Sequence, residues 1–354
     1  MSNNPMMSWP RAIAPSLQSA VLKQQPADFQ VTEHLSFSTS GDGEHCFLLI
    51  EKTGANTQWI VKKLAQQLKV RERDIGYAGL KDRHAITRQW FSIHLPGQDN
   101  PTEISGDEEF KVLRIERNNK KLKHGAIAYN HFAIRLRDCV GSPEKIAEHL
   151  TVIRDRGYPN YFGLQRFGHG GRNVEKAVAM LEGKFKARKN QRSIYLSALR
   201  SWFFNQLLAR RIECGTWQSP RVGDRMQLAG TRSFFMATDD DTQLQQRLDS
   251  GDIHIAGPLP GEDAPQVMSE YAELVESIWQ NYASMIEKIP SKTDWRALRV
   301  IPKALDWRFD DVGHLYLEFE LPSGCYATEL LSELGNVSDA SLKSDEEFNR
   351  ENTA

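Results

Sequence analysis

The irregular order of strand-like and helix-like segments in the first 155 residues is the strongest constraint on the fold. Alternation of apolar and polar residues, together with short apolar runs, predicts strands at 27–38, 46–53, 85–95, 110–117 and 126–138. Apolar residues at helical spacing predict one helix capped by Thr57 and another over 142–157 capped by its Ser. Because strands follow one another without a helix between each pair, the pattern indicates an α+β fold and not repeated βαβ units.

The pattern changes after residue 155. A Gly- and aromatic-rich stretch at 157–171 indicates a junction. Helices are predicted at 172–183, 193–215 and 264–289, with a small hairpin over 220–240. Strand alternation returns at 314–322, before a closing helix at 326–334 that ends on Gly335. We therefore expect a core in two parts, 1–155 and 303–354 with its acidic tail, interrupted by an insertion domain at 156–302.

Composition excludes several classes of protein. A chain of 354 residues is longer than one hydrophobic core usually spans. It has no apolar run near the roughly 20 residues of a membrane span, so no membrane partner is expected. Neither a secretory signal nor a Cys-x-x-Cys pair occurs, which favours a reducing cytoplasmic location. The histidines and cysteines lack metal-ligand spacing, so no metal site is expected.

Charge is nearly balanced overall but unevenly distributed. The net charge is −1, yet eight of the residues from Lys111 to Arg137 are Lys or Arg and only Glu116 is acidic. A second basic cluster runs from 183 to 192. Each cluster is either a solvated face or a surface for a phosphate backbone. Two such clusters in one neutral chain favour a nucleic-acid partner and leave the solvated interpretation open.

One aspartate stands out as a candidate for chemistry. The stretch "GYAGLKDRHAITRQW", residues 76–90, holds a single carboxylate, Asp82, in a loop just before a predicted strand. Its neighbours Lys81 and Arg83 would favour the ionised form if either side chain turned towards it, as a nucleophile or base requires. An aspartate in a Gly-containing loop is also a common turn residue. No second acid lies nearby, which counts against glycoside hydrolysis.

Two features of the 157–171 stretch allow more than one interpretation. Its glycines resemble a phosphate loop but lack the Gly-Lys-Ser/Thr ending, so nucleotide binding is not expected. Its aromatic residues either stack on bases or pack at the domain junction: Tyr158, Tyr161, Phe162 and Phe167. The residues alone indicate an α+β protein and leave RNA binding open as one role.

Five stretches in register resemble the D family of tRNA pseudouridine synthases. They are "KQQPADFQVTE" (23–33), "GYAGLKDRHAITRQW" (76–90), "NHFAIRLR" (130–137), "NYFGLQRFG" (160–168) and "LPSGCYATELL" (321–331). The resemblance implies a pseudouridine-synthase core with a mixed, mainly antiparallel sheet built from two ferredoxin-like halves. It also implies that a mainly helical α/β insertion domain interrupts this core, with tRNA lying in the cleft between them.

The same resemblance implies site residues. Asp82 matches the catalytic aspartate, which acts as nucleophile at C1′ or C6 or as the base at C2′. Five further residues match substrate-contacting positions: Phe29, Asn130, Tyr326, Phe132 and Lys23. Lys23 is expected to pair with Asp82, against the alternative of a surface lysine. Phe132 is expected beside the aspartate, against plain core packing. The family often has Phe where this chain has Tyr326, and the added hydroxyl keeps the stacking ring.

The function implied is isomerisation of a uridine of tRNA, expected at position 13, to pseudouridine. This reaction involves no redox change or net hydrolysis, so neither a cofactor nor a metal is expected. The alternative is a noncatalytic RNA-binding or RNA-folding protein on the same scaffold, which would have no need of Asp82. A nucleosidase is a weaker alternative because no second acid lies near Asp82 in sequence.

Overall fold

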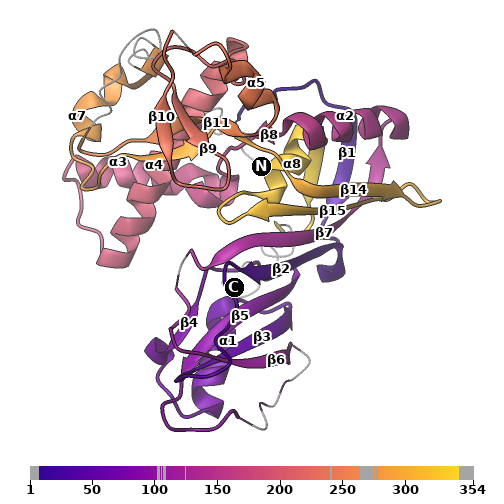
Figure 1. Ribbon diagram of the computed structural model, residues 1–354, viewed down its shortest axis with the longest axis vertical. Helices are drawn as coiled ribbons and strands as arrows, with labels where there is room; N and C mark the ends of the chain where they lie inside the picture. Colours follow the sequence, from indigo (N-terminus) through magenta and orange to yellow (C-terminus); the bar gives the residue numbers. More distant parts are fainter. Residues whose placement is uncertain are drawn as a thin grey trace, which may run out of the picture. The chain divides into compact units, whose positions relative to one another are not determined.

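The computed structural model describes residues 8–101, 104, 106, 109–123, 125–239, 241–263, 274–275 and 278–342. Contacts divide the chain into two compact units (Figure 1). The sheet unit comprises 16–148, 302–324 and the described part of 335–354. The helix-rich unit comprises the described part of 1–15 with 149–301 and 325–334. Over the described residues, every helix is too short or too polar to cross a bilayer.

A ten-stranded sheet builds the sheet unit. Its main path runs β14 (Lys303–Phe309), β15 (Leu315–Pro322), β7 (Ile127–Val140), β2 (Phe29–Leu35), β5 (Ile86–His94), β3 (His45–Thr53) and β6 (Phe110–Asn118). Three more strands join at the sides: β1 (Leu17–Leu22), β16 (Gly335–Asp339) and β4 (Ile75–Tyr77). Pairing is antiparallel except between β2 and β5 and between β1 and β16. The predicted mixed, mainly antiparallel sheet is confirmed.

Helix α1 (Thr57–Gln67) covers one face of β3 and β5. Its apolar stripe is buried, with Ile60 and Leu64 both fully shielded from solvent. The predicted cap is wrong by one residue, because Asn56 accepts the hydrogen bond from Trp59 N at 2.9 Å. Thr57 is the first helical residue, and its hydroxyl bonds to the buried Gln89 instead. Short 3₁₀ turns at Pro26–Asp28 and Glu72–Asp74 complete this region.

The helix-rich unit combines helices with two small sheets. Its described helices include α3 (Arg172–Leu181), α4 (Lys189–Glu213), α5 (Leu244–Asp249), α7 (Ala283–Ile286) and α8 (Ala327–Leu334). A four-stranded sheet has the order β10 (Phe234–Met236), β9 (Arg225–Leu228), β11 (Ile253–Leu259), β12 (Asp294–Ala297). Strands β8 (Tyr158–Pro159) and β13 (Arg299–Val300) form a separate pair. Helix α2 (Pro143–Arg156), capped by the Ser142 hydroxyl as predicted, precedes β8.

Several predictions for the helix-rich unit need correction. Helix α4 begins four residues before its predicted start at 193, whereas the 220–240 hairpin is confirmed as β9 and β10. Of the predicted helix 264–289, residues 264–273, 276 and 277 lie outside the described residues. Over Gln280–Ile286 the structure has a 3₁₀ turn followed by α7. The aromatics of 157–171 are buried in the core of this unit or beside it, so base stacking by them is wrong and packing is correct.

The last helix ends at Leu334 as predicted, but Gly335 has a different role. Helix α8 ends at Leu334, and Gly335 opens strand β16 beside β1 instead of terminating the helix. A Cβ at this position would lie 1.8 Å from the Leu17 carbonyl oxygen, so only glycine permits the two backbones to approach. Neither β1 nor β16 is predicted from the sequence, yet the pair brings the end of the described chain beside its first strand.

Candidate active site around Asp82

Asp82 lies in the loop between β4 and β5, as predicted, and buried polar groups hold this loop in place. Gln89 donates from Nε2 to the Gly79 carbonyl at 2.7 Å, and the Lys81 amide donates to the Thr57 hydroxyl at 3.0 Å. The Lys52 ammonium donates to the Asp82 carbonyl at 3.0 Å. Three hydrogen bonds from neighbouring elements therefore fix the backbone on which the carboxylate stands.

The Asp82 carboxylate is paired on one side and partly open. Its Oδ2 accepts a hydrogen bond from Lys23 Nζ at 2.5 Å, and its Oδ1 accepts one from the His84 amide at 3.0 Å. The side chain keeps 26% of its surface exposed. Burial raises the pKa of Asp82, but the charge and hydrogen bond of Lys23 and the His84 amide outweigh burial and lower it. The group is thus an ionised carboxylate that a bound molecule is able to reach.

Lys23 is buried and shared between two carboxylates. Only 5% of the residue is exposed, so the surface-lysine alternative is wrong and the expected contact with Asp82 is present. Its Nζ also lies 3.0 Å from Asp339 Oδ2, and it sits 4.9 Å from the centre of the Phe29 ring. Burial lowers the pKa of Lys23, but the charges of Asp82 and Asp339 outweigh burial, so the pKa lies above its ordinary value. Lys23 is a permanent cation here.

The cations next to Asp82 in sequence are engaged elsewhere. The Lys81 ammonium lies 2.8 Å from Glu33 Oε1 and donates to Asn130 Oδ1 at 2.9 Å. Arg83 donates from Nε to the Gly54 carbonyl at 3.3 Å. The cation that pairs with Asp82 comes from 59 residues earlier in the chain. Lys81 and Arg83, which would favour the ionised form if they turned towards Asp82, contact other groups, and Lys23 makes the ion pair that the family resemblance implies.

Aromatic rings extend the cluster from Lys23 across β2, β7 and β15. Phe29 on β2 meets Phe132 on β7 edge to face, with ring centroids 6.0 Å apart. Phe132 in turn stacks on Phe319 of β15 at 5.4 Å. Asn130 and Phe132 share one face of β7, as the period of two predicts, and both are buried. Phe132 therefore packs between Phe29 and Phe319, and Phe29 in turn lies beside the Lys23 ammonium.

Tyr326 belongs to the helix-rich unit, in the turn before α8. Its ring meets Phe162 edge to face at 6.1 Å, and its carbonyl accepts a hydrogen bond from the Tyr158 hydroxyl at 3.3 Å. The side chain is half-buried. The other five predicted site residues all lie in the sheet unit.

Three charged residues near Asp82 are missed by sequence reasoning. Lys52, 1% exposed, donates to the carbonyls of Ala55 and Asp82, and burial lowers its pKa to about 8. In the sequence, only its position in the apolar stretch "CFLLIEKT" indicates that Lys52 is buried. Glu33 is buried beneath Lys81. Asp339 is found only through β16, and its Oδ1 accepts hydrogen bonds from the Ser341 amide and hydroxyl.

The predicted basic cluster divides into structural and exposed members. Arg135 and Arg137 both pair with Asp28, whose side chain is fully buried. These arginines therefore hold the fold together. Lys120 and Lys123 are exposed on the loop between β6 and β7, where a phosphate would reach them.

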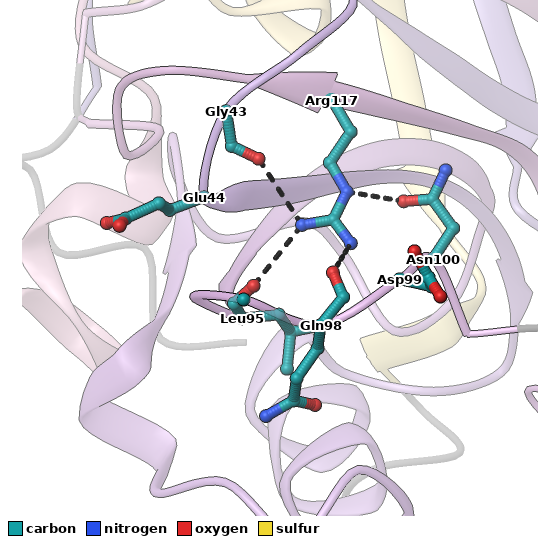
Figure 2. Close-up of a pocket in the computed structure, with 8 residues that line it drawn as sticks. Gly43, Glu44, Leu95, Gln98, Asp99, Asn100 and Arg117 are labelled. Carbon is teal, nitrogen blue, oxygen red and sulfur yellow. Dashed lines mark hydrogen bonds between the residues drawn. The ribbon is translucent and has the colours of Figure 1, made fainter.

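A separate hollow in the sheet unit surrounds Arg117, another member of that cluster (Figure 2). Its guanidinium donates to the carbonyls of Gly43 and Leu95, both at 3.4 Å, and to the Gln98 carbonyl at 2.6 Å. A fourth bond reaches Asn100 Oδ1 at 2.6 Å. Arg117 thus holds the 95–100 loop. Over the described part of the chain, no group of three or more His, Cys, Asp or Glu side chains is placed to bind a metal ion.

Comparisons with known proteins agree on one family. The family model described as tRNA pseudouridine synthase D matches residues 17–187 and 172–334. A tRNA pseudouridine synthase D of Hydrogenovibrio crunogenus is 39% identical over 324 residues, covering 90% of this chain and 93% of the relative. One from Xanthomonas campestris pv. campestris strain B100 is 41% identical over 359 residues, covering 96% and 97%.

A solved structure supports the fold in the same way. A Methanosarcina mazei protein, described as a candidate tRNA pseudouridine synthase D, superposes with a TM-score of 0.72 at 21% identity. The match covers 94% of this chain and 98% of that one. At this identity the likeness concerns the fold, and the sequence relatives carry the family assignment. The chain belongs to the tRNA pseudouridine synthase D family.

Proposed function

We propose that this protein isomerises a uridine of tRNA, at position 13, to pseudouridine, with Asp82 as its catalytic residue. Family membership supports the substrate class and the reaction. The observation that carries the role of Asp82 is its ion pair with the buried Lys23 on a loop fixed from several sides. A turn residue has no need of a buried counter-ion, whereas a largely buried catalytic carboxylate is kept ionised by one and needs an exposed edge to reach its substrate.

The reaction conserves every atom of the nucleotide apart from an exchanged proton. The N1–C1′ bond breaks, the uracil turns, and C5 bonds to C1′ while the C5 proton leaves and N1 gains one. Asp82 acts as nucleophile at C1′ or C6, or as the base that removes the 2′ proton. All three roles require an ionised carboxylate in contact with a base that has left its stack. None requires a redox cofactor or a metal.

Lys23 sets the charge of Asp82 in this proposal. Without a partner, burial would raise the pKa of the carboxyl group and favour its protonated, unreactive form. With the ammonium 2.5 Å away, the carboxylate stays ionised and its remaining exposed surface is free for the substrate. Asp339 on the other side of Lys23 keeps the lysine in place.

The remaining predicted residues bind the base in this proposal. Phe29 offers apolar ring surface beside Lys23, Phe132 lies against Phe29, and Asn130 offers a polar side chain for an edge of the uracil. Tyr326 supplies a stacking ring, a role supported by the family resemblance. We propose residues 1–155 and 303–354 as the catalytic core and 156–302 as the insertion domain, while contacts group 325–334 and the described part of 1–15 with 149–301. The enzyme works on tRNA in the cytoplasm.

Mapping of pseudouridine in bulk tRNA tests this function. Unmodified tRNA is treated with the purified protein, and its pseudouridines are located by chemical derivatisation and reverse transcription. The proposal requires new pseudouridine at position 13 of a subset of tRNAs. Untreated tRNA and tRNA treated with Asp82→Asn provide the matched background. A protein that binds tRNA and leaves every uridine unchanged would be the noncatalytic alternative.

A further inference from the structure

The side-chain amide of Asn130 is held in a single orientation. Its Oδ1 accepts a hydrogen bond from the Lys81 ammonium at 2.9 Å. An ammonium only donates hydrogen bonds, so the amide must turn its oxygen and not its nitrogen towards Lys81. The two N–H groups of Asn130 therefore point away from the lysine.

Lys81 is itself fixed at both ends. Its Nζ lies 2.8 Å from Glu33 Oε1, and the other Glu33 oxygen accepts a hydrogen bond from the Trp90 amide at 2.9 Å. Its backbone amide donates to the Thr57 hydroxyl at 3.0 Å. The Glu33 side chain is completely buried, so any movement of Lys81 away from it would leave a buried charge without its counter-ion. The orientation of Asn130 is consequently held by a rigid group.

The nitrogen of Asn130 is left for a ligand. Among the described residues, the side chain of Asn130 makes one hydrogen bond, which Oδ1 accepts from Lys81, and none through Nδ2. The residue is 8% exposed, but its Nδ2 is not one of the fully buried atoms without a partner, so this nitrogen keeps contact with solvent and a ligand is able to reach it. It stands on β7 directly opposite Glu33 of β2, and Lys81 links it to the loop that carries Asp82. The open donors belong to the same cluster as the candidate catalytic carboxylate.

We propose that Lys81 is a positioning residue that makes Asn130 a hydrogen-bond donor to the target base. This inference rests on the proposed function and adds the polarity of base recognition. Uracil presents two carbonyl oxygens and one N3–H on its edge. With its oxygen bound to Lys81, Asn130 is unable to accept from N3–H and pairs with a carbonyl oxygen. The opposite amide orientation would present an acceptor and favour a different edge.

The test measures binding of tRNA that carries one sulfur atom in the target base. Transcripts are assembled with uridine, 2-thiouridine or 4-thiouridine at the target position. Affinities are measured with Asp82→Asn protein so that the base is not turned over. Sulfur accepts hydrogen bonds more weakly than oxygen, so one of the two analogues should bind about threefold to tenfold more weakly. This penalty should vanish when Asn130→Ala is added.

Variants of Lys81 separate its orienting role from a structural one. Lys81→Arg keeps a donor-only cation and should keep the thio penalty. Glu33→Gln combined with Lys81→Met removes both charges together, avoids an orphaned buried carboxylate, and should abolish the penalty because the amide is then free to turn. Circular dichroism confirms that each variant folds. An equal penalty with and without Asn130, or no penalty with either analogue, would overturn the inference.

Failure of this inference is distinguishable from failure of the proposed function. Wild-type protein is first assayed for release of tritium from C5 of uridine in tRNA. No release would contradict the function itself. Release with a thio penalty that is the same in wild type and in the Asn130 and Lys81 variants would contradict only the assignment of Asn130 as a donor.

Discussion

Lys23 Nζ lies 2.5 Å from Asp82 Oδ2 and 3.0 Å from Asp339 Oδ2, so one buried ammonium joins two carboxylates from distant parts of the chain. The lysine also adopts a φ of 56°, a left-handed backbone conformation that disfavours a side chain by about 1–3 kcal/mol. The surrounding structure maintains this conformation. The arrangement keeps Asp82 ionised in a setting where burial alone would raise the pKa of its carboxyl group.

Replacing Lys23 by Met should therefore abolish most of the turnover while leaving tRNA binding nearly unchanged. We expect kcat/KM to fall about 10²-fold or more, because the carboxylate loses its counter-ion. Tritium release gives the rate, and filter binding gives Kd. Lys62→Met, on the exposed side of α1, is the matched control and should behave as wild type. Equal rates for the two variants would disprove the role of Lys23.

The pH dependence follows from the same pair. The pKa of Asp82 is lowered below its ordinary 3.8, so its ionised form contributes stability above that value and loses it as the pH falls through the lowered pKa. In the wild type, kcat/KM should show no titration of Asp82 between about pH 5 and pH 7. In Lys23→Met, burial persists without the cation, so the acid limb should move to higher pH. Superimposable acid limbs would contradict this assignment.

Lys52 should act through the Asp82 backbone. Its ammonium bonds to the Asp82 and Ala55 carbonyls, so Lys52→Met should lower kcat by roughly tenfold to a hundredfold through displacement of the loop. Its pKa of about 8 predicts a decline of kcat/KM above that pH as the charge is lost. Lys52→Arg remains charged and should lack this alkaline limb. An alkaline limb that persists unchanged in Lys52→Arg would assign it to another group.

Charge substitutions should separate RNA-binding lysines from structural ion pairs. Lys120→Ala with Lys123→Ala removes two exposed cations and should weaken tRNA binding, reducing the salt slope by about 1 for each phosphate that is no longer neutralised. Arg137→Met should instead lower the free energy of unfolding by about 1–3 kcal/mol, because the buried Asp28 loses a charged partner. Salt titrations and urea unfolding measure the two effects. An unchanged salt slope in the lysine variant would remove that loop from the RNA interface.

Local patterns predicted much of the sheet and part of the site. The period of two along β7 placed Asn130 and Phe132 on one face because strand geometry repeats over adjacent residues. The stretch around Asp82 placed the aspartate before β5, and matched stretches elsewhere indicated its role. The Asn56 cap was missed because Asn and Thr are both good capping residues. In the structure the Thr57 hydroxyl bonds to Gln89, and Asn56 caps the helix.

Pairings between distant segments were beyond the reach of local patterns. Asp339 and Lys23 are 316 residues apart. The parallel β1–β16 pair brings them together, and neither of these strands was predicted from the sequence. The chain neighbours of Asp82 drew attention because they are close in sequence, yet Lys81 contacts Glu33. The sequence around Asp82 contains no second acid, but the fold brings Asp339 to the other side of Lys23. Its oxygens bond to Lys23 and Ser341, so it supports the site.

Release of tritium from tRNA labelled at uracil C5 tests the catalytic role of Asp82 most directly. Wild-type protein should release the label and form pseudouridine, while Asp82→Asn should release none and still bind tRNA. Asp42→Asn, on an exposed turn, is the matched control and should retain wild-type turnover. Turnover by Asp82→Asn would contradict the assignment of Asp82, and free uracil in the wild-type reaction would show a nucleosidase instead.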